Sequence, residues 1–106
     1  MNNKVKVVLA QLRRDLEALY GEQLDQVVLY GSQARDDAKP DSDIDVLIVL
    51  KDPFNYSYEI ERLSFIVSPI CLEHNVVISY AFVTIQKLQQ SNNTYFRNVQ
   101  REGVLV

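Results

Sequence analysis

The sequence lacks the features of a secreted, membrane-bound or nucleic-acid-binding protein. It has a single cysteine, Cys71, which excludes an internal disulfide and fits a reducing compartment. No apolar run approaches the ~20 residues of a membrane span, and no signal peptide is visible. Eleven basic residues against 14 acidic ones give a net charge of −3, so there is no basic surface for nucleic acid. We therefore expect a cytoplasmic protein that binds neither a membrane nor nucleic acid directly.

Hydrophobic periodicity predicts helices that alternate with strands. The predicted helices span 3–20, 56–74, 84–90 and 93–102, and the predicted strands span 26–30, 43–50 and 75–83. We expect a short helical turn over residues 32–36 and a polar loop over residues 36–42, which include Pro40. Pro69 should kink the second long helix or split it in two, because proline removes a backbone donor. We expect a single domain over 1–106 of the α/β (α+β) class, a small mixed β-sheet flanked by helices.

The most informative pattern is a glycine-serine turn followed by paired carboxylates. Gly31 and Ser32 end the apolar run 26–30, and Asp43 and Asp45 open the next one after a spacer of ten residues. Strand side chains alternate between faces, so both carboxylates should project from the same side. Two such groups repel unless they are protonated or bridged by a cation. The turn can offer amide groups and a hydroxyl to phosphate oxygens, which predicts a site for metal-assisted nucleotidyl or phosphoryl transfer.

Gly31-Ser32-Gln33-Ala34-Arg35 and Ser42-Asp43-Ile44-Asp45 resemble the motif of the DNA polymerase β superfamily of nucleotidyltransferases. The spacer and the Ala34–Arg35 pair look like those of its smallest branch, the minimal nucleotidyltransferases. The resemblance implies a polymerase-β-like fold. It also implies that Asp43 and Asp45 are catalytic and bind Mg²⁺, and that Gly31, Ser32 and Arg35 bind a nucleoside triphosphate, ATP.

The same resemblance implies an antitoxin that forms a hetero-oligomer with a HEPN-domain ribonuclease toxin. As an enzyme, it would move AMP from ATP to a hydroxyl of that toxin, a tyrosine. The alternative is a binding module that neutralises or scaffolds the HEPN partner by contact alone. Adenylation of the partner would discriminate between the two hypotheses.

The sequence does not decide two features of the site, namely its third carboxylate and the role of Arg35. Enzymes of the superfamily generally carry a third carboxylate on a neighbouring strand, but the run 75–83 contains no acid. Asn75 or Ser79 would stand in its place, and Glu73 would join that face only if the strand began two residues earlier. Arg35 has two interpretations of equal weight, one as a triphosphate ligand and one as a clamp on the loop at 36–37.

Overall fold

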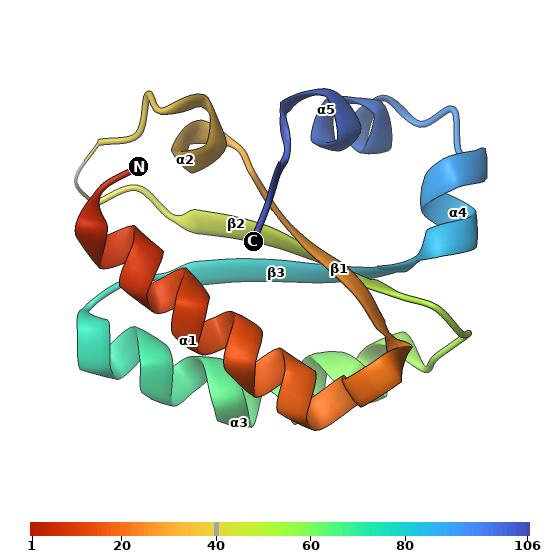
Figure 1. The fold of residues 1–106 in the computed structure, drawn as a ribbon, viewed down its shortest axis with the longest axis horizontal. Helices are drawn as coiled ribbons and strands as arrows, with labels where there is room; N and C mark the ends of the chain where they lie inside the picture. The colour runs from red at the N-terminus through yellow and green to blue at the C-terminus, as the bar shows by residue number, and fades with distance from the viewer. Residues whose placement is uncertain (40) are drawn as a thin grey trace.

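A four-stranded mixed sheet with helices on both faces forms the centre of the molecule (Figure 1). The computed structural model describes residues 1–39 and 41–106. The strand order is β3-β2-β1-β4, with β1 at Leu24–Tyr30, β2 at Ile44–Leu50, β3 at Ile78–Thr84 and β4 at Val104–Leu105. β1 is antiparallel to β2 and to β4, whereas β2 and β3 are parallel. The predicted fold class, a small mixed sheet flanked by helices, is confirmed.

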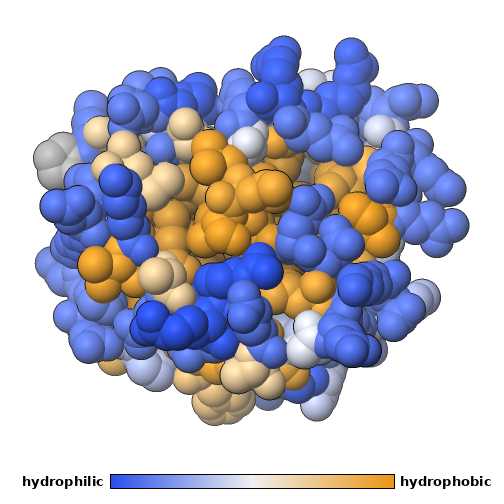
Figure 2. Space-filling view, in the orientation of Figure 1, coloured by the Kyte–Doolittle hydropathy of each residue, from blue (hydrophilic) through white to orange (hydrophobic). Residues whose placement is uncertain are grey.

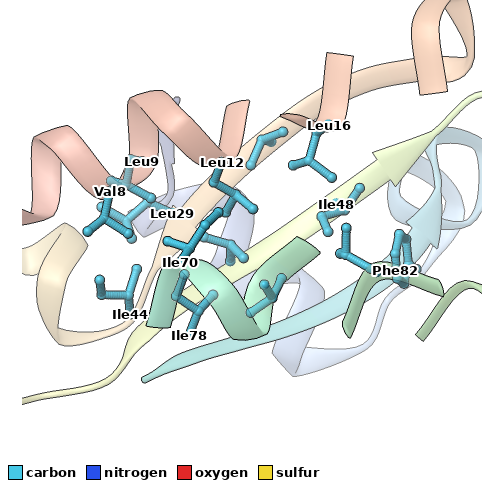
Figure 3. Packing of buried hydrophobic residues seen from close by; sticks show 14 of the residues in the cluster. Val8, Leu9, Leu12, Leu16, Leu29, Ile44, Ile48, Ile70, Ile78 and Phe82 are labelled. Carbon is cyan, nitrogen blue, oxygen red and sulfur yellow. The ribbon is translucent and has the colours of Figure 1, made fainter. Parts of the chain in front are cut away.

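The two long helices, α1 (Asn3–Tyr20) and α3 (Tyr56–His74), cover one face of the sheet (Figure 1). The side chains of Asn2 and Asn55 cap them, because Oδ1 of each accepts a hydrogen bond from the backbone N–H three residues later. Both helices span the predicted ranges. Between them and the sheet lies the larger core, part of which Figure 3 shows. Its α1 members recur at helical spacing and are Val5, Val8, Leu9, Leu12 and Leu16.

Pro69 does not split the second long helix, so that alternative of the prediction is wrong. α3 is continuous from Tyr56 to His74. The carbonyl that loses its helical partner is that of Phe65, four residues earlier. Phe65 is 76% exposed, and Pro69 is exposed too. Water can therefore hydrogen-bond to the free carbonyl, which lowers the cost of the proline.

Two shorter helices, α4 (Ile85–Gln90) and α5 (Thr94–Glu102), lie against the other face of the sheet. The one-turn helix α2 (Ser32–Arg35) follows the end of β1, and its Ala34 packs against the larger core. Thr84 caps α4, because its hydroxyl accepts a hydrogen bond from the N–H of Lys87. A smaller core lies under α4 and α5 and consists of Val28, Leu47, Val49, Val83, Leu88 and Val99. α5 has one fully buried side chain, that of Val99. None of the helices in the described ranges is long and apolar enough to span a bilayer.

The last strand, β4, was not predicted. Its two residues pair with Val28 and Leu29 of β1 at the edge of the sheet. Two residues are too few to produce an alternating pattern, so the sequence carried no signal for this strand. Val104 and Leu105 are 41% and 69% exposed, and Figure 2 shows apolar side chains in the middle of this view, surrounded by hydrophilic ones.

Candidate active site

The glycine-serine turn and the carboxylate pair lie together, at the end of β1 and the start of β2. Tyr30, the last residue of β1, is the cross-strand partner of Asp45, so Gly31 follows directly beside that carboxylate. Gly31 has φ +73° and ψ −156°, a conformation that glycine alone adopts readily. A Cβ atom at position 31 would lie 2.5 Å from Oδ2 of Asp45. The backbone therefore approaches the carboxylate as closely as glycine permits.

The two carboxylates influence each other, as their i, i+2 spacing predicted. Asp43 is exposed just before β2, and Asp45 is half-buried within it. Burial and, after it, the negative charge of Asp43 raise the pKa of Asp45, whereas the positive charge of Arg35 opposes this shift. Within residues 1–39 and 41–106, neither carboxylate accepts a hydrogen bond. Their oxygens are thus available to a ligand.

The turn after Gly31 is held by its own backbone and by one buried side chain. The carbonyl of Gly31 accepts hydrogen bonds from the amides of Ala34 and Arg35, both at 3.1 Å, which close the helical turn α2. Gln33 is buried, and its Nε2 donates to the carbonyl of Ser42 at 3.4 Å. This contact links the turn to the segment that leads into Asp43. Ser32 lies at the start of α2, half-buried.

Arg35 links the turn to its own loop and to the last helix. Its Nε lies 3.2 Å from Oδ2 of Asp37, as the clamp interpretation predicted. Its Nη1 lies 3.3 Å from Oε2 of Glu102 at the end of α5, a contact that was not predicted. Asp36 is bound instead by the N-terminal ammonium group of Met1, at 2.6 Å. Contact of Arg35 with a triphosphate stays a prediction.

Ser79 stands beside Asp45 on the neighbouring parallel strand. The two residues are register partners, so their side chains project from the same face of the sheet. Asn75 lies before β3 and ends α3 in a left-handed conformation with φ +54°. Glu73 belongs to α3, 3.7 Å from the ring of His74, so the strand does not extend back to it. In the described ranges, no three groups of the His, Cys, Asp and Glu types form a metal cluster.

Tyr95 of α5 also belongs to this region, although no sequence pattern predicted it there. Its hydroxyl donates a hydrogen bond to that of Tyr30 at 2.8 Å. Burial, this hydrogen bond and, last, the charge of Asp45 raise the pKa of Tyr95. These interactions connect segments that are far apart in the sequence, 65 residues in the case of the hydrogen bond. No local pattern could have revealed them, because the packing of α5 on the sheet brings the two rings together.

Replacing Asp45 with asparagine should leave the melting temperature at neutral pH, without metal, equal to or above that of the parent. The pKa of Asp45 is raised in the folded state, so the folded protein binds this proton more tightly than the unfolded chain does. The ionised carboxylate therefore costs stability above the raised pKa, and the variant avoids that cost. Its advantage should shrink as the pH falls through the raised pKa and vanish below about 3.9, where the parent carboxyl is protonated in both states. Thermal melts across this pH range check the expectation, and a variant that melts below the parent at neutral pH contradicts it.

Comparison with known proteins agrees with this geometry. The model of the nucleotidyltransferase domain family matches residues 9–104. Two proteins of Methanocaldococcus jannaschii bear the name "Putative protein adenylyltransferase". MJ0141 is 32% identical over 72 residues, which are 68% of this chain and 72% of the relative. MJ0604 is 33% identical over 90 residues, which are 83% of each protein.

A crystal structure of a toxin–antitoxin with AMP-PNP has the same fold, with a TM-score of 0.63 at 17% identity over 98% of this chain and 72% of the other. The chain belongs to the nucleotidyltransferase domain family and is a nucleotidyltransferase.

Proposed function

We propose that this nucleotidyltransferase moves AMP from ATP to a tyrosine hydroxyl of a partner protein. The partner would be a HEPN-domain ribonuclease toxin, which makes the chain its antitoxin in a cytoplasmic hetero-oligomer. The observation that carries the proposal is the close approach of Gly31 to Asp45, with Asp43 beside it. It sets a backbone turn that can bind phosphate against a carboxylate pair that can bind a cation.

The donor set fits Mg²⁺. This cation keeps several water ligands and is usually bound by one or two carboxylates together with substrate phosphates. Asp43 and Asp45 supply two carboxylates whose mutual repulsion contributes to the raised pKa of Asp45, and a cation would relieve it. When bound, Mg²⁺ would neutralise charge on the triphosphate and help to orient it. The residues that would hold it are Asp43 and Asp45.

The rest of the turn would bind the triphosphate. The backbone amide of Gly31 and the hydroxyl of Ser32 would donate hydrogen bonds to phosphate oxygens. Arg35 already pairs with Asp37 and Glu102, so it would contribute positive charge to the region without giving up those contacts. The acceptor hydroxyl oxygen would attack the α-phosphorus and form a new phosphate ester. The bond between the α-phosphorus and the oxygen that bridges to the β-phosphate would break, pyrophosphate would leave, and the hydroxyl proton would pass to solvent.

The alternative function, binding without transfer, draws on one observation. Ser79, the register partner of Asp45, offers a hydroxyl where a third carboxylate would complete the site. A site with two carboxylates would then bind ATP and the partner but leave the acceptor hydroxyl without a base. In that case the same fold would neutralise the HEPN protein by contact.

Co-expression with the HEPN partner tests both functions. Size-exclusion chromatography shows whether the two proteins form a complex, and mass spectrometry after incubation with ATP and Mg²⁺ shows whether AMP is attached to a tyrosine. We expect a stable complex and a modified partner. A stable complex without AMP on the partner favours binding alone, and two separate proteins without modification contradict both functions.

A further inference from the structure

Tyr30 begins an aromatic surface directly beside the carboxylates. It is the antiparallel cross-strand partner of Asp45. Side chains opposite each other on such strands project from the same face, with Cβ atoms roughly 5 Å apart. The next residue is Gly31, so the ring of Tyr30, the turn and Asp45 occupy one small area of the sheet.

Tyr95 extends this surface from α5. Its hydroxyl donates to that of Tyr30 at 2.8 Å, and the two ring centroids are 5.6 Å apart with the planes at 89°. Burial, the hydrogen bond to Tyr30 and the charge of Asp45 raise the pKa of Tyr95, so its hydroxyl stays protonated and neutral. The residue is nevertheless 40% exposed. An uncharged aromatic side chain is thus open to solvent within the electrostatic reach of Asp45.

Both ends of α5 are attached to the site. Near its start, Tyr95 contacts Tyr30. At its end, Glu102 contacts Arg35 of the turn at 3.3 Å, and Val99 between them is buried against the sheet. When α5 is packed on the sheet, these contacts fix the position of the Tyr95 ring relative to the turn and the carboxylates.

We propose that Tyr95, positioned by Tyr30, is the surface on which the base of the nucleoside triphosphate stacks. The inference rests on the proposed function, because it assumes that the triphosphate binds at Gly31 and the carboxylates. A nucleotide held there carries its base a sugar's length away, within reach of a neighbouring aromatic ring. Stacking on aromatic side chains accepts every base, since each has a π-face. The hydroxyl of Tyr30 accepts the hydrogen bond that orients the ring.

Calorimetric titration with two ligands separates base stacking from phosphate binding. In the presence of Mg²⁺, we compare ATP with inorganic tripolyphosphate, which has no base. Tyr95→Ala should weaken ATP binding about tenfold, the effect expected for loss of one stacked base, and leave tripolyphosphate binding unchanged. Tyr95→Phe keeps the ring and should retain most of the ATP affinity. The matched control is Tyr58→Ala, which removes a tyrosine that is 58% exposed on α3 and should change neither affinity.

Each other outcome has a definite meaning. Equal ATP affinity in Tyr95→Ala and the parent overturns the inference and leaves the proposed function standing. If Tyr95→Ala lowers the affinities for ATP and tripolyphosphate equally, the inference is also overturned. Tyr95 would then maintain only the shape of the site. If the parent binds neither ATP nor tripolyphosphate, the proposed function itself fails.

Discussion

Replacing Gly31 with alanine should destabilise the protein and abolish nucleotide binding. The backbone at this position has φ +73° and ψ −156°, and other residues are held in such a conformation at a cost of about 1–3 kcal/mol. The added methyl group would also lie 2.5 Å from Oδ2 of Asp45, so the carboxylate or the strand must move. For a domain of this size, each kcal/mol lowers the melting temperature by roughly 4–8 °C. Thermal melts, followed by ATP titration with Mg²⁺ below the melting temperature, measure both effects.

Two further variants separate the backbone cost from the clash. Gly31→Ala made together with Asp45→Ala removes the oxygen that the methyl group would meet, so it should lose less stability than the two single losses added together. Gly21→Ala is the matched control, because Gly21 also has positive φ, +56°, but a Cβ atom there would have no neighbour within 4 Å. It should lower the melting temperature through the backbone alone and leave ATP binding intact. A Gly31→Ala protein that binds ATP like the parent would show that the turn is not part of the site.

Removing both carboxylates should have the largest effect on activity. In the double variant Asp43→Asn, Asp45→Asn the amides keep the shape of the side chains and remove both negative charges. We expect AMP transfer to the partner to fall at least about a hundredfold, the scale on which single electrostatic contacts to a transition state act. The gain in melting temperature that we expect for the parent with ATP and Mg²⁺ should also disappear. Mass spectrometry of the partner and thermal melts provide the two measurements.

The double variant should remain folded, which keeps this test interpretable. The charge of Asp43 and the burial of Asp45 disfavour the ionised form of Asp45, so neutral amides should not lower the melting temperature of the free protein. Asp41→Asn is the matched control, because Asp41 is an exposed acid in the same segment. It should transfer AMP at the parent rate. Transfer at the parent rate by the double variant as well would refute the assignment of the site.

The parts of the site that are close in sequence were predictable, and those that come from distant segments were not. Gly31 directly follows β1 and Asp45 lies in β2, the next strand, so turn chemistry and the alternation of side chains were enough to bring them together. Tyr95 and Glu102 reach the same place from α5, whose position depends on tertiary packing. The place of Ser79 became clear only from the parallel register of β2 and β3, because the predicted strand began at 75 and the observed one at Ile78.

In the fold, too, the features that depend on local sequence were predictable and those that depend on tertiary contacts were not. The ranges of the two long helices followed from their apolar periodicity and were confirmed at both ends. The predicted split at Pro69 was wrong, because local rules do not say that the carbonyl it leaves free belongs to a solvent-exposed residue. β4 could not be predicted because it exists only through its pairing with β1.

The sparse burial of α5 has a consequence for how the protein moves. α1 buries five side chains, whereas α5 buries one, Val99. Segments with few buried apolar contacts open at a much smaller free-energy cost than the whole domain. The helix that presents Tyr95 can therefore detach and return many times during the life of one folded molecule, while α1, α3 and the sheet stay assembled. The site would then alternate between a closed form, with α5 packed on the sheet, and an open form, with α5 detached. A ligand that contacts Tyr95 would lengthen the time spent in the closed form.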